Sequence, residues 1–304
     1  MRTADDGEPA EGPDGTGTSD RDQATETSDV PQGQTAGTGT TDRDQATETS
    51  AVRPGLAVVI TGGTQGIGAG IATAFLRAGC RVLVCGRTAP ADAARLPSAG
   101  GQTAAFCQAD VRDPDQARRL IRTASAEFGR VDVVINNAGG SPEAAAATAS
   151  PRFHQKIIEL NLLAPLHVAQ SANEVMQDQD GGGTIIMIGS VSGTRPSPGT
   201  AAYGAAKAGL HHLVTSLAIE WAPQVRVNCV APGFVETEAA SGHYGETDAV
   251  RRTVPLQRLG TPADVAGACL FLVSPQAGYV SGATLLLHGG GEPPGFLAAA
   301  RGPA

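Results

Sequence analysis

The first 54 residues have very few of the large apolar side chains that could start a core. They contain no Phe, Trp, Tyr, Leu or Ile and are rich in Gly, Pro, Thr, Asp and Gln. Such a segment buries too little apolar surface to offset the entropy lost on ordering, so we expect a disordered tail over residues 1–54. The stretch TSDRDQATETSDV at 18–30 returns as TTDRDQATETSAV at 40–52. This near-copy is too polar to stack as a repeat unit, and we interpret it as a duplicated linker, with a binding motif as the alternative.

The rest of the chain lacks a net charge. Residues 1–54 hold 12 acidic and 4 basic residues, whereas the remainder holds 18 of each, so the net charge of −8 belongs to the tail. A neutral body offers no electrostatic footprint for nucleic-acid phosphates or anionic membranes, and an acidic tail would repel both. We therefore expect a small-molecule substrate, with no nucleic-acid and no membrane partner.

Metal-binding and targeting patterns are also missing. The five cysteines show no CxxC or Cys/His ligand spacing, and most lie in apolar runs, which predicts reduced core residues and no metal site. No basic region followed by an apolar segment opens the chain, and no apolar stretch approaches the ~18 residues of a membrane span. We expect a cytoplasmic protein.

Short apolar runs alternate with helical patterns from Leu56 onward, and this alternation predicts a parallel sheet. Because the runs are apolar throughout, helices should cover both faces of the sheet. We predict a single α/β domain over residues 55–304, with a doubly wound, Rossmann-like, seven-stranded parallel sheet. The expected strands are AVVIT, RVLVCGR, TAAFCQAD, VDVVINNAG, GTIIMIGS, VRVNCVAPG and ATLLLHGG.

The segment TGGTQGIG at 61–68 places four glycines between the first expected strand and the first expected helix. Glycine costs roughly 1 kcal/mol more than alanine inside a helix, so this grouping needs a positive reason. Either the backbone makes a tight turn, or a ligand touches the backbone. In doubly wound sheets a dinucleotide pyrophosphate meets a helix N-terminus at this position, although a glycine pattern alone is weak evidence.

Four further motifs follow or end later strands: NNAG at 136–139, GS at 189–190, YGAAK at 203–207 and PGFVET at 232–237. Together with the glycine turn, their order and spacing resemble the short-chain dehydrogenase/reductase family from about Leu56 to Gly291. The resemblance implies an NAD(P)(H)-dependent oxidoreductase that interconverts a secondary alcohol and a ketone, and a homo-oligomer, a tetramer or a dimer. A catalytically silent cofactor sensor and an enoyl reductase are the alternatives.

The resemblance also implies which residues hold the cofactor. Gly62 and Gly66 would allow close approach of the pyrophosphate, and Gly68 would let the helix pack on the strand. Asp110 and Val111 would flank the adenine ring, although Asp110 could instead belong to the first turn of the next helix. The full implied set is Thr61, Gly62, Gln65, Gly66, Ile67, Gly68, Arg87, Asp110, Val111, Asn137, Ala138, Gly139, Tyr203, Lys207, Pro232, Gly233, Val235 and Thr237.

The end of the second expected strand bears on the choice of cofactor. An acidic residue there would bind the ribose 2′-hydroxyl of NAD, and a basic residue would accept the 2′-phosphate of NADP. Here Gly86 stands where the acid would be, and Arg87 follows. We predict NADP(H), with NAD(H) as the alternative in which Arg87 is an ordinary surface arginine.

Reduction of a ketone needs a hydride on carbon and a proton on oxygen, so a general acid must lie beside the nicotinamide. Tyr203 is the candidate, because Lys207 lies one helical turn away and a nearby cation favours the phenolate. Ser190 precedes Tyr203 by thirteen residues, as the catalytic serine of the family does, and could polarise the carbonyl. Ser192 is its competitor. His211 and His212 are expected to be surface or packing residues.

Asn161 matches the active-site asparagine of the family and lies in an expected helix that also contains Pro165. Proline lacks the N–H that would bond the carbonyl of Asn161. That carbonyl could hold a water that links Lys207 to solvent, or the proline could merely bend the helix. The polar segment at about 234–259 is predicted to be a substrate lid.

Overall fold

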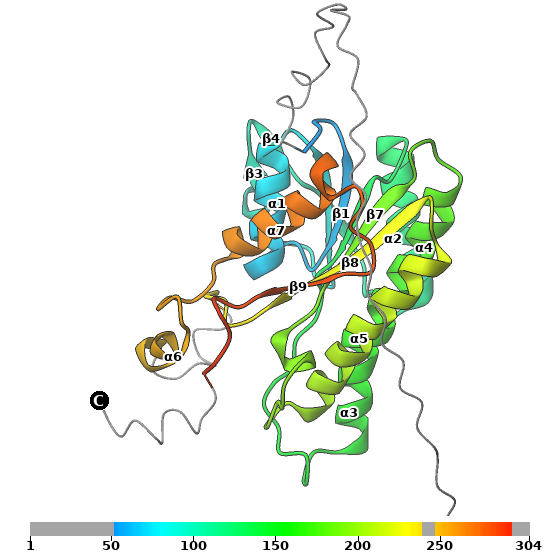
Figure 1. The fold of residues 1–304 in the computed structure, drawn as a ribbon. Helices are drawn as coiled ribbons and strands as arrows, with labels where there is room; N and C mark the ends of the chain where they lie inside the picture. Colours follow the sequence, from blue (N-terminus) through cyan, green and yellow to red (C-terminus); the bar gives the residue numbers. More distant parts are fainter. Residues whose placement is uncertain (1–51, 239–246, 294–304) are drawn as a thin grey trace, which may run out of the picture. The chain divides into compact units, whose positions relative to one another are not determined.

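The computed structural model describes residues 52–238 and 247–293 of the chain (Figure 1). The tail is predicted over 1–54, and its residues 1–51 lie outside this part of the chain, as do residues 239–246 of the expected lid. Residues 52–54 are described, and Val52 is buried in the core, so the tail ends earlier than predicted. Among the described residues, no helix is long and apolar enough to cross a lipid bilayer.

A parallel sheet of seven strands forms the centre of the fold and confirms the predicted architecture. The strand order is β5-β2-β1-β6-β7-β8-β9, so the chain reverses direction across the sheet after β5 and returns to β6 beside β1. Ligands of such sheets bind at this reversal, beyond the carboxyl ends of the strands. The strands are β1 Ala57–Thr61, β2 Arg81–Gly86, β5 Ala105–Gln108, β6 Val133–Asn136, β7 Gly183–Ile188, β8 Val225–Pro232 and β9 Thr284–Leu287, and a separate hairpin joins β3 Ser98–Ala99 to β4 Gln102–Thr103.

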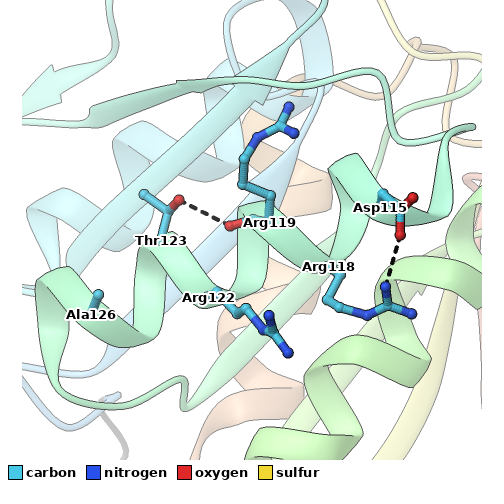
Figure 2. Close-up of a pocket in the computed structure, with 6 residues that line it drawn as sticks. All are labelled: Asp115, Arg118, Arg119, Arg122, Thr123 and Ala126. Carbon is cyan, nitrogen blue, oxygen red and sulfur yellow. Dashed lines mark hydrogen bonds and ion pairs between the residues drawn. The ribbon is translucent and has the colours of Figure 1, made fainter.

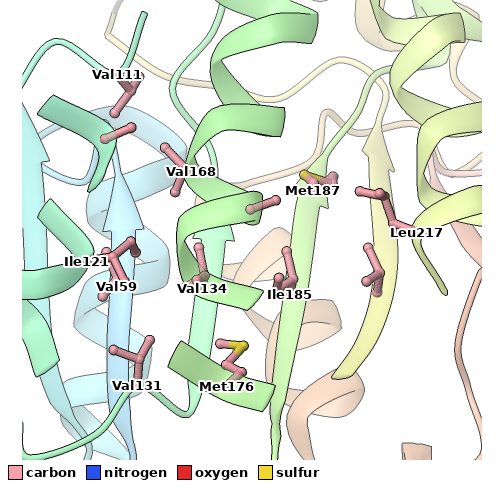
Figure 3. Packing of buried hydrophobic residues seen from close by; sticks show 14 of the residues in the cluster. Val59, Val111, Ile121, Val131, Val134, Val168, Met176, Ile185, Met187 and Leu217 are labelled. Atoms are coloured by element: carbon pink, nitrogen blue, oxygen red, sulfur yellow. The ribbon is translucent and has the colours of Figure 1, made fainter. Parts of the chain in front are cut away.

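Helices cover both faces because successive side chains of each strand point to opposite sides. Val58 and Ile60 pack toward α1 (Gly66–Arg77) and α7 (Pro262–Val273), which lie side by side in Figure 1. Val59, between them, packs into the other core with α2 (Pro114–Phe128), α4 (Ala164–Gln177) and α5 (Ala201–Glu220). Figure 3 shows this second core, where Val168 and Met176 of α4 lie near Val134 and Ile185 of the strands and Leu217 of α5 lies farther along the sheet.

Local signals fix where the helices begin. Asp113 caps α2 by accepting hydrogen bonds from the N–H groups of Asp115 and Gln116, and proline follows at the first helical position. Thr261 and Asp264 form a reciprocal capping box at the start of α7. The shorter elements are η2 Ala93–Arg95, α3 Pro151–Ile158, the π-helical turn η3 Glu159–Leu163, η4 Val191–Gly193, α6 Thr247–Thr253 and η5 Pro275–Ala277.

Candidate active site

The glycine turn between β1 and α1 combines a tight backbone with close packing. Gly62 (φ 63°) and Gly66 (φ 55°) adopt left-handed conformations that favour glycine. A Cβ atom on Gly68 would lie 2.3 Å from the Gly62 carbonyl oxygen and 2.5 Å from Nδ2 of Asn137. The first turn of α1 can therefore approach the end of β1 this closely only because Gly68 has no side chain. Gln65 precedes α1 in an extended conformation, and its side chain makes no capping hydrogen bond to the helix.

Asn137 ties the end of β6 to the end of β1. Its Nδ2 donates to the carbonyl oxygens of Thr61 (2.9 Å) and Gly62 (3.1 Å). In return, the Thr61 hydroxyl oxygen accepts from the main-chain N–H groups of Asn137 (3.0 Å) and Ala138 (2.9 Å). These four bonds join the two strands at the point where the strand order reverses.

The ends of β2 and β5 bring three charged residues together. Arg87 is exposed after β2, and its carbonyl oxygen accepts a hydrogen bond of 2.9 Å from Nε2 of Gln108. The Asp110 carboxylate is gripped by the Arg112 guanidinium, with 2.9 Å between Nε and Oδ1 and a second contact to Oδ2. Bonding to Arg112 chiefly, with help from the charge of Arg87, lowers the pKa of Asp110. The cap of α2 is Asp113, so Asp110 serves as the partner of Arg112 and not as the helix cap.

Lys207 is almost completely buried on α5, with 3% of its surface exposed. Its Nζ donates to the carbonyl oxygen of Ile188 at 2.7 Å and lies 5.6 Å from the centre of the Tyr203 ring. Burial lowers the pKa of Lys207 from 10.5 to about 8, so the side chain is mostly cationic at neutral pH. A Cβ on Gly139 would lie 3.4 Å from Nζ, so the missing side chain lets the loop after β6 approach this cation.

Asn161 is fully buried in the π-helical turn η3, immediately before α4. Its Oδ1 accepts from the Gly140 N–H at 2.9 Å, and its Nδ2 donates to the carbonyl oxygens of Gly140 (2.9 Å) and Ile157 (3.0 Å). The side-chain amide thus clamps the loop after β6 to the helix. The Ala164 N–H bonds the Glu159 carbonyl, five residues back, which is the π-helical pattern.

Ser190 follows β7, and two hydrogen bonds hold it. Its Oγ accepts from the Ser192 N–H at 3.1 Å, and its own N–H donates to Nε2 of His211 at 3.4 Å. A hydroxyl that accepts one bond still has its hydrogen to donate. Ser192 lies in the turn η4 and supplies the main-chain donor to Ser190, which is the turn role expected for it.

The PGFVET segment follows β8 and reaches the glycine turn. Val235 is buried and pairs with Gly260 in an isolated bridge, while the Glu236 N–H donates to the Gly260 carbonyl at 2.8 Å. The two ends of the expected lid are therefore fastened together. The Thr237 side chain lies 3.7 Å from the Cβ position of Gly66, beside the N-terminus of α1. Pro232 ends β8, and the Gly233 N–H donates to the Leu287 carbonyl at 2.9 Å.

A separate surface depression lies on α2 (Figure 2). It is lined by Asp115, Arg118, Arg119, Arg122, Thr123 and Ala126, all from this one helix. Arg118 pairs with Asp115 at 2.8 Å. Because no strand end contributes to it, this depression is not part of the site around Lys207.

Sequence reasoning missed two residues of this region. Arg112 follows Asp110 by two positions, and that spacing of opposite charges was the available signal. His211, expected on the surface or in packing, is half-buried under Ser190. The predicted core cysteines Cys80, Cys85, Cys229 and Cys269 are buried free thiols, and Cys107 is partly buried.

Comparisons with known proteins agree on one family of oxidoreductases. A family model described as enoyl-(acyl carrier protein) reductase matches residues 62–292. An uncharacterized oxidoreductase of Mycobacterium tuberculosis is 37% identical over 238 residues, which are 76% of this chain and 90% of that protein. The 3-oxoacyl-[acyl-carrier-protein] reductase FabG of Chlamydia muridarum is 35% identical over 239 residues, covering 77% of this chain and 96% of FabG. The crystal structure of a short-chain type dehydrogenase/reductase from Mycobacterium marinum is similar with a TM-score of 0.74 and 32% identity, over 79% of this chain and 97% of that one.

Proposed function

The chain belongs to the short-chain dehydrogenase/reductase family, and from this premise we propose that it interconverts a secondary alcohol and a ketone, with Tyr203 as general acid and base. Membership makes it an oxidoreductase that uses a nicotinamide cofactor. The observation that carries the proposal is the buried Lys207 ammonium, 5.6 Å from the Tyr203 ring. Burial of a cation without a carboxylate partner costs free energy of folding, and a functional role for its charge explains why the chain keeps it.

The residues of the glycine turn fit a dinucleotide. The side chain of the N-cap residue Gln65 makes no capping hydrogen bond, and the first N–H groups of α1 together with the helix dipole suit a pyrophosphate. Gly62, Gly66 and Gly68 leave no side chain in the way, and Thr237 would bind at the same place. We assign Thr61, Gln65, Ile67, Ala138 and Gly139 to the same cradle, with Pro232, Gly233 and Val235 beside the nicotinamide.

The proposed chemistry divides between cofactor and chain. The bound nicotinamide supplies or accepts the hydride. Tyr203 gives its hydroxyl proton to the carbonyl oxygen, and the charge of Lys207 stabilises the phenolate that remains. Ser190 donates its hydroxyl hydrogen to the same oxygen and polarises the carbonyl. In the oxidative direction Tyr203 takes the proton from the alcohol.

Replacement of the Tyr203 proton is proposed to run through Lys207 and a water on the main-chain carbonyl of Asn161. Pro165 supports this, because it lacks the N–H that would bond the Asn161 carbonyl in a regular helix. The π-helical turn around Asn161 is a second departure from regular helical bonding. A crystal structure with ordered water tests the relay. We expect a water bridging the Asn161 carbonyl oxygen and Nζ of Lys207, and a regular main-chain hydrogen bond to that carbonyl would overturn it.

We propose NADP(H) as the preferred cofactor, with NAD(H) as the alternative. Gly86 puts no carboxylate at the end of β2, and Arg87 is exposed directly after it. Arg87 is near enough to lower the pKa of Asp110, so its charge acts across the adenosine region. We place Asp110 and Val111 beside the adenine, with Asp110 held in position by Arg112.

We also propose that copies of the chain self-associate. β9 is the last strand of the sheet and exposes Leu285 and Leu286, while Phe271 of α7 is 47% exposed and Tyr279 is fully exposed. An edge strand flanked by exposed apolar side chains suits burial against a second copy. Light scattering should give a dimer or tetramer mass, and a monomer mass at all concentrations would contradict the proposal.

A turnover screen of ketones and secondary alcohols with NADPH, NADH and their oxidised forms tests the function. We expect reduction of one or more ketones, which is measured as a loss of the absorbance of the reduced nicotinamide. Reduction of enoyl thioesters without ketone turnover would make the chain an enoyl reductase. Tight cofactor binding with no turnover of any class would make it a cofactor sensor.

A further inference from the structure

His211 lies beneath the loop that carries Ser190. It sits on α5 one helical turn after Lys207, and its Nε2 accepts the hydrogen bond of 3.4 Å from the Ser190 N–H. Lys207 itself donates to the carbonyl oxygen of Ile188 at 2.7 Å. Two residues one turn apart on α5 therefore bind the main chain at the end of β7: Lys207 binds Ile188, and His211 binds Ser190.

The imidazole occupies space that two glycines leave open. A Cβ atom on Gly189 would lie 2.4 Å from Nε2 of His211, and a Cβ on Gly193 would lie 2.8 Å from Cε1. Contacts below 3 Å require movement. The Cβ on Gly189 would also lie 2.6 Å from Sγ of Cys229, and the Cβ on Gly193 would also lie 2.8 Å from the α5 backbone at Lys207 and Ala208, so the ring and its surroundings together exclude a side chain at both positions. The two glycines stand on either side of Ser190, and the ring thus shapes the loop around the serine.

The ring is a hydrogen-bond acceptor at neutral pH. Burial lowers the pKa of His211 below its usual 6.5, and the charge of Lys207 lowers that pKa further. A neutral imidazole has one N–H and one acceptor nitrogen. Acceptance at Nε2 therefore requires the hydrogen to be on Nδ1, a tautomer set by this contact.

We propose that His211 is a positioning residue for Ser190. It holds the serine main chain from below, while the Ser192 N–H holds Oγ at 3.1 Å, so the hydroxyl hydrogen is directed to the substrate oxygen. His211 transfers no proton in this role and needs no carboxylate partner. The proposal deepens the proposed function, because Ser190 acts on a carbonyl only if that function is right.

Two substitutions at His211 separate positioning from packing. His211→Leu keeps bulk but removes the acceptor, whereas the Oε1 of His211→Gln can accept from the Ser190 N–H. On the best ketone of the turnover screen, we expect His211→Leu to lower kcat about three- to tenfold, the effect of losing roughly one hydrogen bond, with unchanged NADPH affinity. His211→Gln should recover at least half of the wild-type kcat. The exposed neighbour His212 is the matched control, and His212→Leu should have no effect.

Coupling to Ser190 gives the decisive comparison. In a Ser190→Ala background, His211→Leu should cause no further loss, because there is no hydroxyl left to position. Equal losses in the Leu and Gln variants, or a full additional loss without the serine hydroxyl, would overturn the proposal in favour of simple packing.

A spectroscopic test stands apart from turnover. Long-range ¹H–¹⁵N NMR of the full chain reports the tautomer of each histidine, and the His211 signal is identified by its absence in His211→Gln. We expect Nδ1–H at neutral pH. An Nε2–H tautomer would overturn the positioning role even if ketones are reduced, and the Nδ1–H tautomer without ketone turnover would locate the failure in the proposed function.

Discussion

Removal of the buried charge of Lys207 should change how stability depends on pH. Lys207 is 3% exposed, and its Nζ donates to the Ile188 carbonyl. No carboxylate of the described residues pairs with it. Its pKa falls from 10.5 to about 8 through burial. Between these two values the unfolded chain keeps a proton that the folded chain has released, so stability rises with pH across this window.

The size of the effect follows from the two pKa values. The quantity compared is the free energy of unfolding of the wild type minus that of Lys207→Met. The linkage relation predicts that this difference increases by about 2 kcal/mol from pH 7 to pH 9.5. Taking the difference between the two proteins cancels the titrating groups that do not interact with Lys207. Stopping at pH 9.5 keeps the Cys229 thiol protonated, because burial raises its pKa to about 11.

The assay is urea unfolding, and the fluorescence of the single tryptophan reports the unfolded fraction. This residue, Trp221, is 9% exposed after α5, so its emission should change when the helix leaves the sheet. Protein concentration is held constant, since self-association would shift stability. A difference that stays flat or falls as pH rises would show that Lys207 is not held as an unpaired buried cation, and would refute the reasoning.

Two further predictions concern the nucleotide half of the site. Arg87→Asp should shift the ratio of kcat/KM for NADPH over NADH by at least tenfold toward NADH, about 1.4 kcal/mol, because it replaces a cation by an acid; a wild type that already prefers NADH would contradict the NADP(H) assignment. Gly68→Ala should lower the free energy of unfolding by about 1–3 kcal/mol and weaken cofactor binding, since its Cβ would lie 2.3 Å from the Gly62 carbonyl oxygen. The matched control is Gly267→Ala in α7, where a Cβ meets nothing within 4 Å and the change should stabilise by about 0.5–1 kcal/mol in urea unfolding.

The central sheet was predictable because the sequence of each of its seven strands carries a local signal, whereas the short hairpin of β3 and β4 was not predicted. β1 and β7 are short apolar runs bounded by glycine-rich turns, and their buried faces demanded helices on both sides. The approach of Tyr203 and Lys207 was equally predictable, since residues four apart share one face of a helix.

Contacts between distant segments were harder to predict. The partner of His211 is a main-chain N–H twenty-one residues earlier, and a main-chain donor leaves no mark in the sequence. Pro165 predicted an irregular helix near Asn161 but not its kind, because a kink and a π-helical turn both accommodate a missing N–H. Asp110 had two interpretations. The cap at Asp113 places Asp110 before the first turn of α2, and its position beside the adenine stays a prediction.

The central claim is that Tyr203 exchanges the proton at the substrate oxygen, and Tyr203→Phe tests it most directly. NADPH affinity is measured by fluorescence titration, and turnover is measured on a ketone reduced by the wild type. The account predicts an unchanged Kd for NADPH and a loss of at least about a hundredfold in kcat, the contribution of a positioned general acid. Retention of a tenth or more of the wild-type kcat with normal cofactor binding would contradict it.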